Sequence, residues 1–226
     1  MFARAACVTA AVALLLTAPG PATAKRASPF VPAGYRVEHR LSLQLDADGR
    51  PDRALVLRRV GKIGAGTPDR RLVVLRSRGF GSYSAAGEGR KILLCSSCGG
   101  AFFGTVDAPV KLSSKKRTLV IRQSFGSRTV TEQTFRLALR QGGAQVIGYD
   151  ELVRDRATGA WTSTSTNLLT RSRVTERRSR GGKVVRKTST VDVKPIPLSR
   201  VDRDHPLRQV TRSRVRRPRR ASDWRP

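Results

Sequence analysis

The chain has 226 residues, a length that corresponds to one domain or two small ones. Lys and Arg number 45 against 16 Asp and Glu, which gives a formal net charge of +29. Hydrophobic residues make up 38% of the chain, enough to bury a modest core. These values exclude a polytopic membrane protein, a collagen and a wholly disordered chain, and the positive charge predicts attraction to polyanions.

The first 24 residues have the organisation of a secretory signal peptide. Arg4 precedes an apolar run over residues 5–18, and Ala22-Thr23-Ala24 forms a small-x-small cleavage site. The run is shorter than the ~20 residues that a membrane-spanning helix needs, and no later segment is long and apolar enough to span. We therefore expect a signal peptide over residues 1–24, a linker over residues 25–34, and export to the periplasm or the extracellular medium.

The segment after the linker carries strand signals. Residues 35–45 alternate apolar side chains, such as Tyr35, with polar ones, and a period of two predicts a half-buried strand. Short apolar runs bounded by Gly, Pro and Asp follow at residues 54–57, 72–75 and 92–94. Runs of this kind predict strands that are buried on both faces.

Further strand signals extend to residue 195, and most are separated by glycine-containing turns. They lie at residues 119–121, 135–139, 145–153, 161–174 and 184–193. Thr and Val dominate the last arms, as strands prefer, and no apolar stripe with helical period follows the signal peptide. The sequence therefore predicts an all-β fold, a mostly antiparallel sandwich or barrel-like domain over residues 35–195, divided into parts 35–94 and 95–195.

The C-terminal residues 196–226 form an Arg-rich stretch with few apolar side chains. Residues 208–226 contain eight Arg and one acidic residue, Asp223. Such a stretch cannot bury enough surface to offset its ordering entropy, so we expect a disordered basic tail. Its nonspecific binding to polyanions is expected to involve Arg212, Arg214, Arg216, Arg217, Arg219 and Arg220.

An acidic loop lies between the first two predicted strands, in the sequence Gln44-Leu-Asp-Ala-Asp-Gly-Arg-Pro-Asp52. Alternate carboxylates followed by Gly favour a hard cation, but an EF-hand would need Glu where Leu55 stands. The spacing resembles the acidic loop of FG-GAP/VCBS-type repeats. That resemblance implies weak calcium binding by the carboxylates of Asp46, Asp48 and Asp52 and the backbone carbonyl of Arg50. The alternative is a plain Asp-Gly turn without an ion, and no other cofactor is expected.

Cys95 and Cys98 form a Cys-x-x-Cys-Gly-Gly segment with Gly99 and Gly100. In an exported chain, two cysteines three positions apart favour a disulfide. A redox pair, a metal site and free thiols remain as alternatives. The Gly pair opposes a helix start of the thioredoxin type, and zinc would need two further ligands from a chain with only two histidines.

Taken together, these motifs extend the resemblance. Asp48 to Asp52, Cys95 to Gly100, Phe125-Gly126-Ser127 and residues 164–170 resemble segments of bacterial secreted proteins and lipoproteins with an FG-GAP/VCBS-like start. The resemblance covers about residues 35–195. It implies a fold type and an extracytoplasmic compartment, and it implies no reaction.

Three classes of function remain open. The sequence favours a non-enzymatic exported β-rich protein that binds or supports an unidentified component of the cell envelope. The second class is an electrostatic polyanion binder that acts through its Arg-rich surface and tail. An enzyme is the least favoured, because the chain has no nucleophile elbow, phosphate-binding loop or dinucleotide fingerprint and only two histidines.

Overall fold

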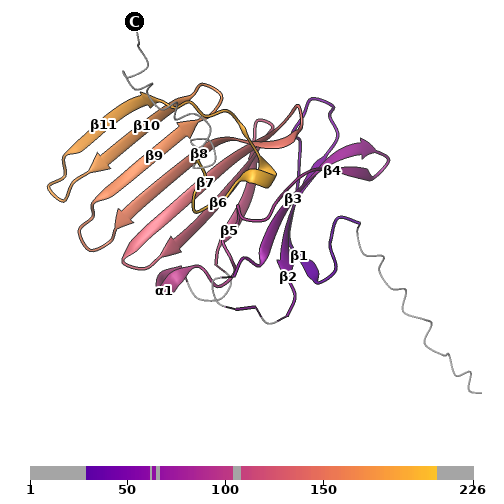
Figure 1. The fold of residues 1–226 in the computed structure, drawn as a ribbon, viewed down its shortest axis with the longest axis horizontal. Helices are drawn as coiled ribbons and strands as arrows, with labels where there is room; N and C mark the ends of the chain where they lie inside the picture. Colours follow the sequence, from indigo (N-terminus) through magenta and orange to yellow (C-terminus); the bar gives the residue numbers. More distant parts are fainter. Residues whose placement is uncertain (1–28, 62, 65–66, 104–107, 208–226) are drawn as a thin grey trace, which may run out of the picture.

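The computed structural model describes residues 29–61, 63–64, 67–103 and 108–207. These residues form two antiparallel sheets and little helix (Figure 1). The prediction of a mostly antiparallel all-β fold is confirmed, and the described strands form two separate sheets rather than one closed barrel. The expected signal peptide, and the arginines expected to bind polyanions at 212–220, lie outside the described residues.

The first sheet contains four strands in the order β1-β2-β3-β4. They span β1 Tyr35–Leu43, β2 Asp52–Arg59, β3 Arg70–Gly79 and β4 Ser82–Gly89. The apolar runs of β2 and β3 are buried on both faces, as their composition predicts. Val56 and Leu72 face the main core, whereas Leu55 and Leu75 pack on the opposite face against Phe30 and other residues of the N-terminal segment.

The second sheet is a meander in which sequential strands pair, with order β11-β10-β9-β8-β7-β6-β5. Its strands are β5 Val110–Lys115, β6 Thr118–Gly126, β7 Thr129–Arg140, β8 Gly143–Asp155, β9 Trp161–Asn167, β10 Ser172–Arg178 and β11 Val184–Thr190. The single arm expected over residues 161–174 is wrong, because Asn167 caps a turn there. Its side chain accepts hydrogen bonds from the N–H groups of Leu169 and Thr170, and the chain reverses into β10.

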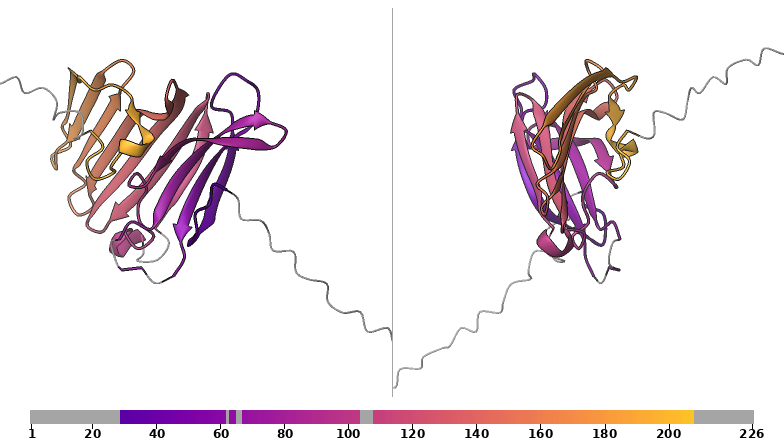
Figure 2. Two further views of the ribbon diagram at one scale, coloured as in Figure 1. Left: turned by 45° about the vertical axis from the view of Figure 1, so that its right-hand side comes forward. Right: turned by 90° about the vertical axis from the view of Figure 1, so that its left-hand side faces the viewer.

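The main core lies between the two sheets. Phe135 and Leu137 of β7 and Ile121 of β6 belong to the same buried cluster as Val56 and Leu72 of the first sheet. The strands β9, β10 and β11 form the end of the second sheet that is farthest from the first sheet (Figures 1 and 2). This end of the larger sheet therefore has little protein packed on it, and β11 is exposed along its whole length.

The segment that joins the sheets is held by side chains rather than by strand pairing. The strand expected at residues 92–94 is not formed, although Ile92, Leu93 and Leu94 are all buried. The Gln123 amide accepts a hydrogen bond from the Leu94 N–H at 2.8 Å and donates to the Ile92 carbonyl at 3.1 Å. Buried backbone groups need such partners, and here a glutamine from β6 replaces a neighbouring strand.

The expected start of the disordered tail at residue 196 is also wrong. Ile196 and Pro197 form β12, which pairs with β8, and the short 3-10 helix Leu198–Arg200 follows. Ile196, Leu198 and Val201 are all buried in the main core. Leu198 packs onto Gly89 so closely that a Cβ there would lie 2.7 Å from a Leu198 methyl group. These three apolar side chains therefore fix residues 196–201 to the core, although the composition of the C-terminal stretch predicts a disordered tail.

Arg70, which is 2% exposed, connects β3 to two other parts of the fold. Its guanidinium makes a two-pronged ion pair with Glu38 of β1. The remaining nitrogen, Nη1, donates to the carbonyls of Leu94 and Ala108 in the joining segment, at 3.3 and 2.7 Å. One side chain thus satisfies a carboxylate and two backbone oxygens, as a buried charge requires.

We predict that Arg70→Ala lowers the free energy of unfolding by about 3 kcal/mol, because it leaves the largely buried Glu38 carboxylate with only the longer ion pair to Arg58, at 3.9 Å, and leaves two carbonyls without their donor. Chemical denaturation of the full chain measures this loss. The matched control is Arg76→Ala, which removes the surface ion pair with Asp46 and is expected to cost about 0–1 kcal/mol. Equal losses in the two variants would contradict the structural role of Arg70.

Candidate functional site

The hairpin formed by β10 and β11 is the most basic element of the described fold. Between residues 171 and 190 the chain contains eight Lys or Arg and one acidic residue, Glu176. We call residues 171–190 the basic ribbon. The basic residues are Arg171, Arg173, Arg177, Arg178, Arg180, Lys183, Arg186 and Lys187.

Few of these charges are neutralised by neighbours. Arg186 pairs with Glu176 at 3.6 Å and Arg171 with Asp192 at 3.7 Å. Arg173 donates a hydrogen bond to the Thr166 hydroxyl. Within the described part of the chain, the other five basic side chains of the ribbon form no ion pair with a carboxylate. Their mutual repulsion is relieved only by solvent and counterions, which makes the ribbon a source of positive potential.

The register places cations on both faces of the ribbon. Arg177 opposes Val185 and Thr175 opposes Lys187, so Arg177 and Lys187 lie on one face. Arg178 opposes Val184 on the other face. Positive charge therefore surrounds the ribbon instead of marking a single face.

A shallow hollow of about 660 Å³ lies where the ribbon meets the rest of the sheet. Val153, Thr162, Arg177 and Val185 oppose one another in register from β8 to β11 and form a row across it. Asp155 lies at its edge, and hydrogen bonds from the backbone of Thr158 above all hold the pKa of Asp155 below its ordinary value. The hollow thus combines an apolar lining, which includes Trp161, with charges of both signs and a surplus of cations.

The acidic loop uses its carboxylates to hold its own backbone. Asp52 is fully buried, and its two oxygens accept hydrogen bonds from the N–H groups of Leu45 and Ser77, each at 2.9 Å. Asp46 accepts a hydrogen bond from the Asp48 N–H and pairs with Arg76 at 2.7 Å. Burial raises the pKa of Asp46, but these hydrogen bonds and the Arg76 charge outweigh it and hold the pKa below its ordinary value.

The remaining features of the loop match an Asp-Gly turn. Asp48 accepts a hydrogen bond from the Arg50 N–H two positions on, and Gly49 has a φ of +73° that glycine adopts without strain. Among the described residues, no three His, Cys, Asp or Glu side chains come together as metal ligands would. The loop geometry supports the plain turn, and calcium binding at Asp46, Asp48, Arg50 and Asp52 stays a prediction.

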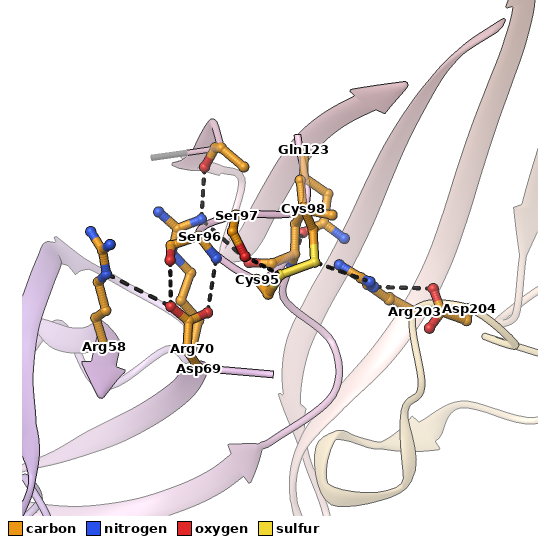
Figure 3. Close-up of a disulfide and its surroundings, with 12 residues drawn as sticks. Arg58, Asp69, Arg70, Cys95, Ser96, Ser97, Cys98, Gln123, Arg203 and Asp204 are labelled. Carbon is orange, nitrogen blue, oxygen red and sulfur yellow. Dashed lines mark hydrogen bonds and ion pairs between the residues drawn. A yellow bond between two sulfur atoms is a disulfide. The ribbon is translucent and has the colours of Figure 1, made fainter. Parts of the chain in front are cut away.

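Cys95 and Cys98 lie at disulfide distance, with their Cα atoms 5.1 Å apart, as the sequence predicts (Figure 3). The loop that they close is fixed by Asp69, which accepts hydrogen bonds from both the N–H and the hydroxyl of Ser96. On the other side, Arg203 lies 3.9 Å from the Cys98 sulfur (Figure 3). The Gly pair predicts that no helix forms here, yet the short helix α1, Gly100–Phe103, begins at Gly100. Cys95, the first cysteine, lies five positions before it and so does not sit at a helix start of the thioredoxin type.

Among the described residues, the chain of hydrogen bonds that links Gln133, Tyr149 and Glu151 most resembles a catalytic arrangement. The Tyr149 hydroxyl donates to Glu151 at 2.6 Å, and Gln133 donates to Tyr149 and to the Arg203 carbonyl. Burial, and then the Glu151 carboxylate, raise the pKa of Tyr149, so its proton is held. These hydrogen bonds tie the C-terminal segment to the second sheet, and the three residues do not line the hollow of the basic ribbon.

Sequence reasoning missed the basic ribbon and the contacts of Arg70 and Asp69. The ribbon carries a local signal, since eight basic residues stand against one acid over twenty positions, but the Val and Thr residues of the same segment indicate only strand formation. The local sequence gives no such signal for the buried charges of Asp69 and Arg70. Asp69-Arg70 reads as an ordinary exposed pair, and its burial depends on residues up to 38 positions away.

No family model, curated protein or solved structure matches this chain. The resemblance to FG-GAP/VCBS-type proteins therefore stays a hypothesis. No helix among the described residues has the length and apolar character that crossing a membrane requires.

We predict that replacing both Cys95 and Cys98 with Ser lowers the free energy of unfolding by about 2 kcal/mol or less, because a loop this short limits the entropic gain from the cross-link. Denaturation under oxidising conditions measures the effect, with the unmodified chain under the same conditions as the reference. Reduction of a test disulfide by the unmodified chain would contradict a structural role for the pair.

We predict that Asp52→Asn lowers the free energy of unfolding by about 1–3 kcal/mol, because the new amide cannot accept both backbone hydrogen bonds. The same loop is expected to bind calcium weakly or not at all, since its carboxylates are already engaged and Arg76 opposes a cation. Titration calorimetry of the full chain tests this second expectation. A dissociation constant tighter than ~10 µM would contradict it.

Proposed function

We propose that this chain is an exported, non-enzymatic β-rich module of the cell envelope that binds an anionic polymer through the basic ribbon. The observation that carries the proposal is the combination of charge and exposure in β10 and β11. Cations lie on both faces, all seven residues of β11 are exposed, and most of the basic side chains have no carboxylate partner among the described residues.

The physical basis is the release of counterions. A polymer that carries regularly spaced phosphate, sulfate or carboxylate groups holds a condensed layer of cations, and each Lys or Arg that replaces one gains entropy. Charges on both faces suit a flexible polymer that can follow either side of the ribbon. The ribbon itself contains no aromatic residue, and Trp161 beside Arg178 is the one aromatic residue that lines the adjoining hollow. Stacking on bases therefore contributes little, and sequence preference is not expected.

Two features support the extracytoplasmic part of the proposal, and a third supports the binding of an anionic polymer. The apolar run and small-x-small site of residues 1–24 predict export. The Cys95–Cys98 pair at disulfide distance fits an oxidising compartment. The Arg-rich residues 208–226 add net charge to the same chain and would extend the electrostatic footprint.

We predict that changing Arg177, Arg178 and Lys183 to Gln weakens binding to a DNA duplex used as a polyanion of known charge density. Each lost contact removes about one unit from the slope of log affinity against log salt, so the slope should fall by roughly 2–3. Titrations at several salt concentrations measure it.

The matched control changes Lys111, Arg122 and Arg140 to Gln, which removes the same charges from exposed positions outside the ribbon. Net charge is then equal in the two variants, and only position differs. Equal affinities and slopes would contradict a role for the ribbon and would assign the binding to total charge. Repeating both titrations on a chain that ends at Leu207 separates the ribbon from the residues that follow.

A further inference from the structure

The turn between β3 and β4 places a phenylalanine at the most exposed point of the hairpin. Gly79 pairs with Ser82, so Phe80 and Gly81 form a two-residue turn. Phe80 is 112% exposed relative to the reference state, which means that its ring contacts essentially nothing in the fold. The hairpin points away from the main body, at the right of Figure 1.

The backbone at this turn disfavours the residue that occupies it. Phe80 and Gly81 have φ values of +49° and +74°, the left-handed pair that a type I′ hairpin turn requires. Asn, Asp and Gly are the residues that adopt this conformation readily, whereas a bulky aromatic residue there is strained. Since the ring gains no burial in return, the fold itself gives no reason for phenylalanine at this position.

The charges around Phe80 have one dominant sign. The Arg50 guanidinium lies against Gly79, 3.4 Å from where a Cβ would stand, and Arg78 donates a hydrogen bond to Ser84. Arg76 lies on the same strand two residues before Arg78, and its pair with Asp46 leaves it half exposed. We call Phe80 with Arg50, Arg76 and Arg78 the Phe80 tip.

We propose that the Phe80 tip is a contact site for an anionic lipid surface. The ring would enter the boundary between headgroups and acyl chains, while the guanidinium groups pair with lipid phosphates. A protein partner fits less well, because a stable protein interface buries about 800 Å² per side and the tip offers one apolar side chain among cations. One aromatic ring with basic neighbours suits weak, reversible and salt-dependent attachment to a surface.

The tip and the basic ribbon lie at opposite ends of the long axis of the molecule (Figure 1). Contact of the tip with lipid therefore leaves the ribbon accessible, and a polymer on the ribbon leaves the tip accessible. The lipid contact does not depend on the polymer-binding proposal, since no residue is shared by the two surfaces.

The test places a fluorescent reporter at the tip. Phe80→Trp in the full chain is titrated with phosphatidylglycerol-containing vesicles whose acyl chains carry bromine, a short-range quencher. The matched control is Phe102→Trp, because Phe102 of α1 is also exposed, at 53%, but lies away from the hairpin (Figure 1). Trp161, Trp224 and the apolar residues 5–18 are present in both variants, so their contributions cancel in the difference between the two.

The expected result is at least twofold stronger quenching of the reporter at position 80 than at position 102, lost in phosphatidylcholine vesicles and at high salt. A second variant, Phe80→Asn, should raise the Tm, because Asn tolerates the left-handed turn, and should reduce vesicle binding at low salt. Absent quenching at position 80, equal quenching at both positions, or a lower Tm for Phe80→Asn would each overturn the proposal. If the ribbon variants fail to change polyanion binding, the proposed function fails but the proposal for the Phe80 tip still stands.

Discussion

The buried guanidinium of Arg70 is the contact on which the rest of the structure depends. It joins β1 and β3 through Glu38 and holds the carbonyls of Leu94 and Ala108 at either end of the segment that leads to the second sheet. That segment contains the Cys95–Cys98 pair, and Asp69, the neighbour of Arg70, fixes Ser96 between the two cysteines. Two adjacent charged residues thus set the path of the chain from one sheet to the other.

The unequal size of the two sheets determines which surfaces are left for binding. A four-stranded sheet and the C-terminal segment pack on the part of the larger sheet that contains Phe135 and Leu137. The strands beyond, β10 and β11, have too little protein over them to bury apolar side chains. Val184 and Val185 are more than half exposed, and most of the other residues are Arg, Lys, Ser and Thr. The exposed basic ribbon is therefore a direct consequence of incomplete coverage.

The two proposed surfaces differ in how the chain maintains them. The ribbon's charges repel one another, but most of its residues have ordinary strand conformation, so the charge accumulates without backbone strain. The Phe80 tip holds an aromatic ring at a left-handed turn position, where the fold receives no packing in return. The acidic loop and the cysteine pair, by contrast, have their polar groups engaged by neighbouring backbone and contribute to stability.

The sequence by itself determined the β character, the buried runs of β2 and β3 and the Cys95–Cys98 pair, because these depend on alternation, local composition and short separation. Only the tertiary structure decided the rest. Residues 92–94, and likewise Ile196, Leu198 and Val201, are apolar enough to be buried, but their conformation depends on Gln123 and on the space beside Gly89. Asp52 and Arg70 carry charges that sequence patterns assign to the surface. Their burial follows from hydrogen-bond partners that are distant in sequence and close only in the folded chain.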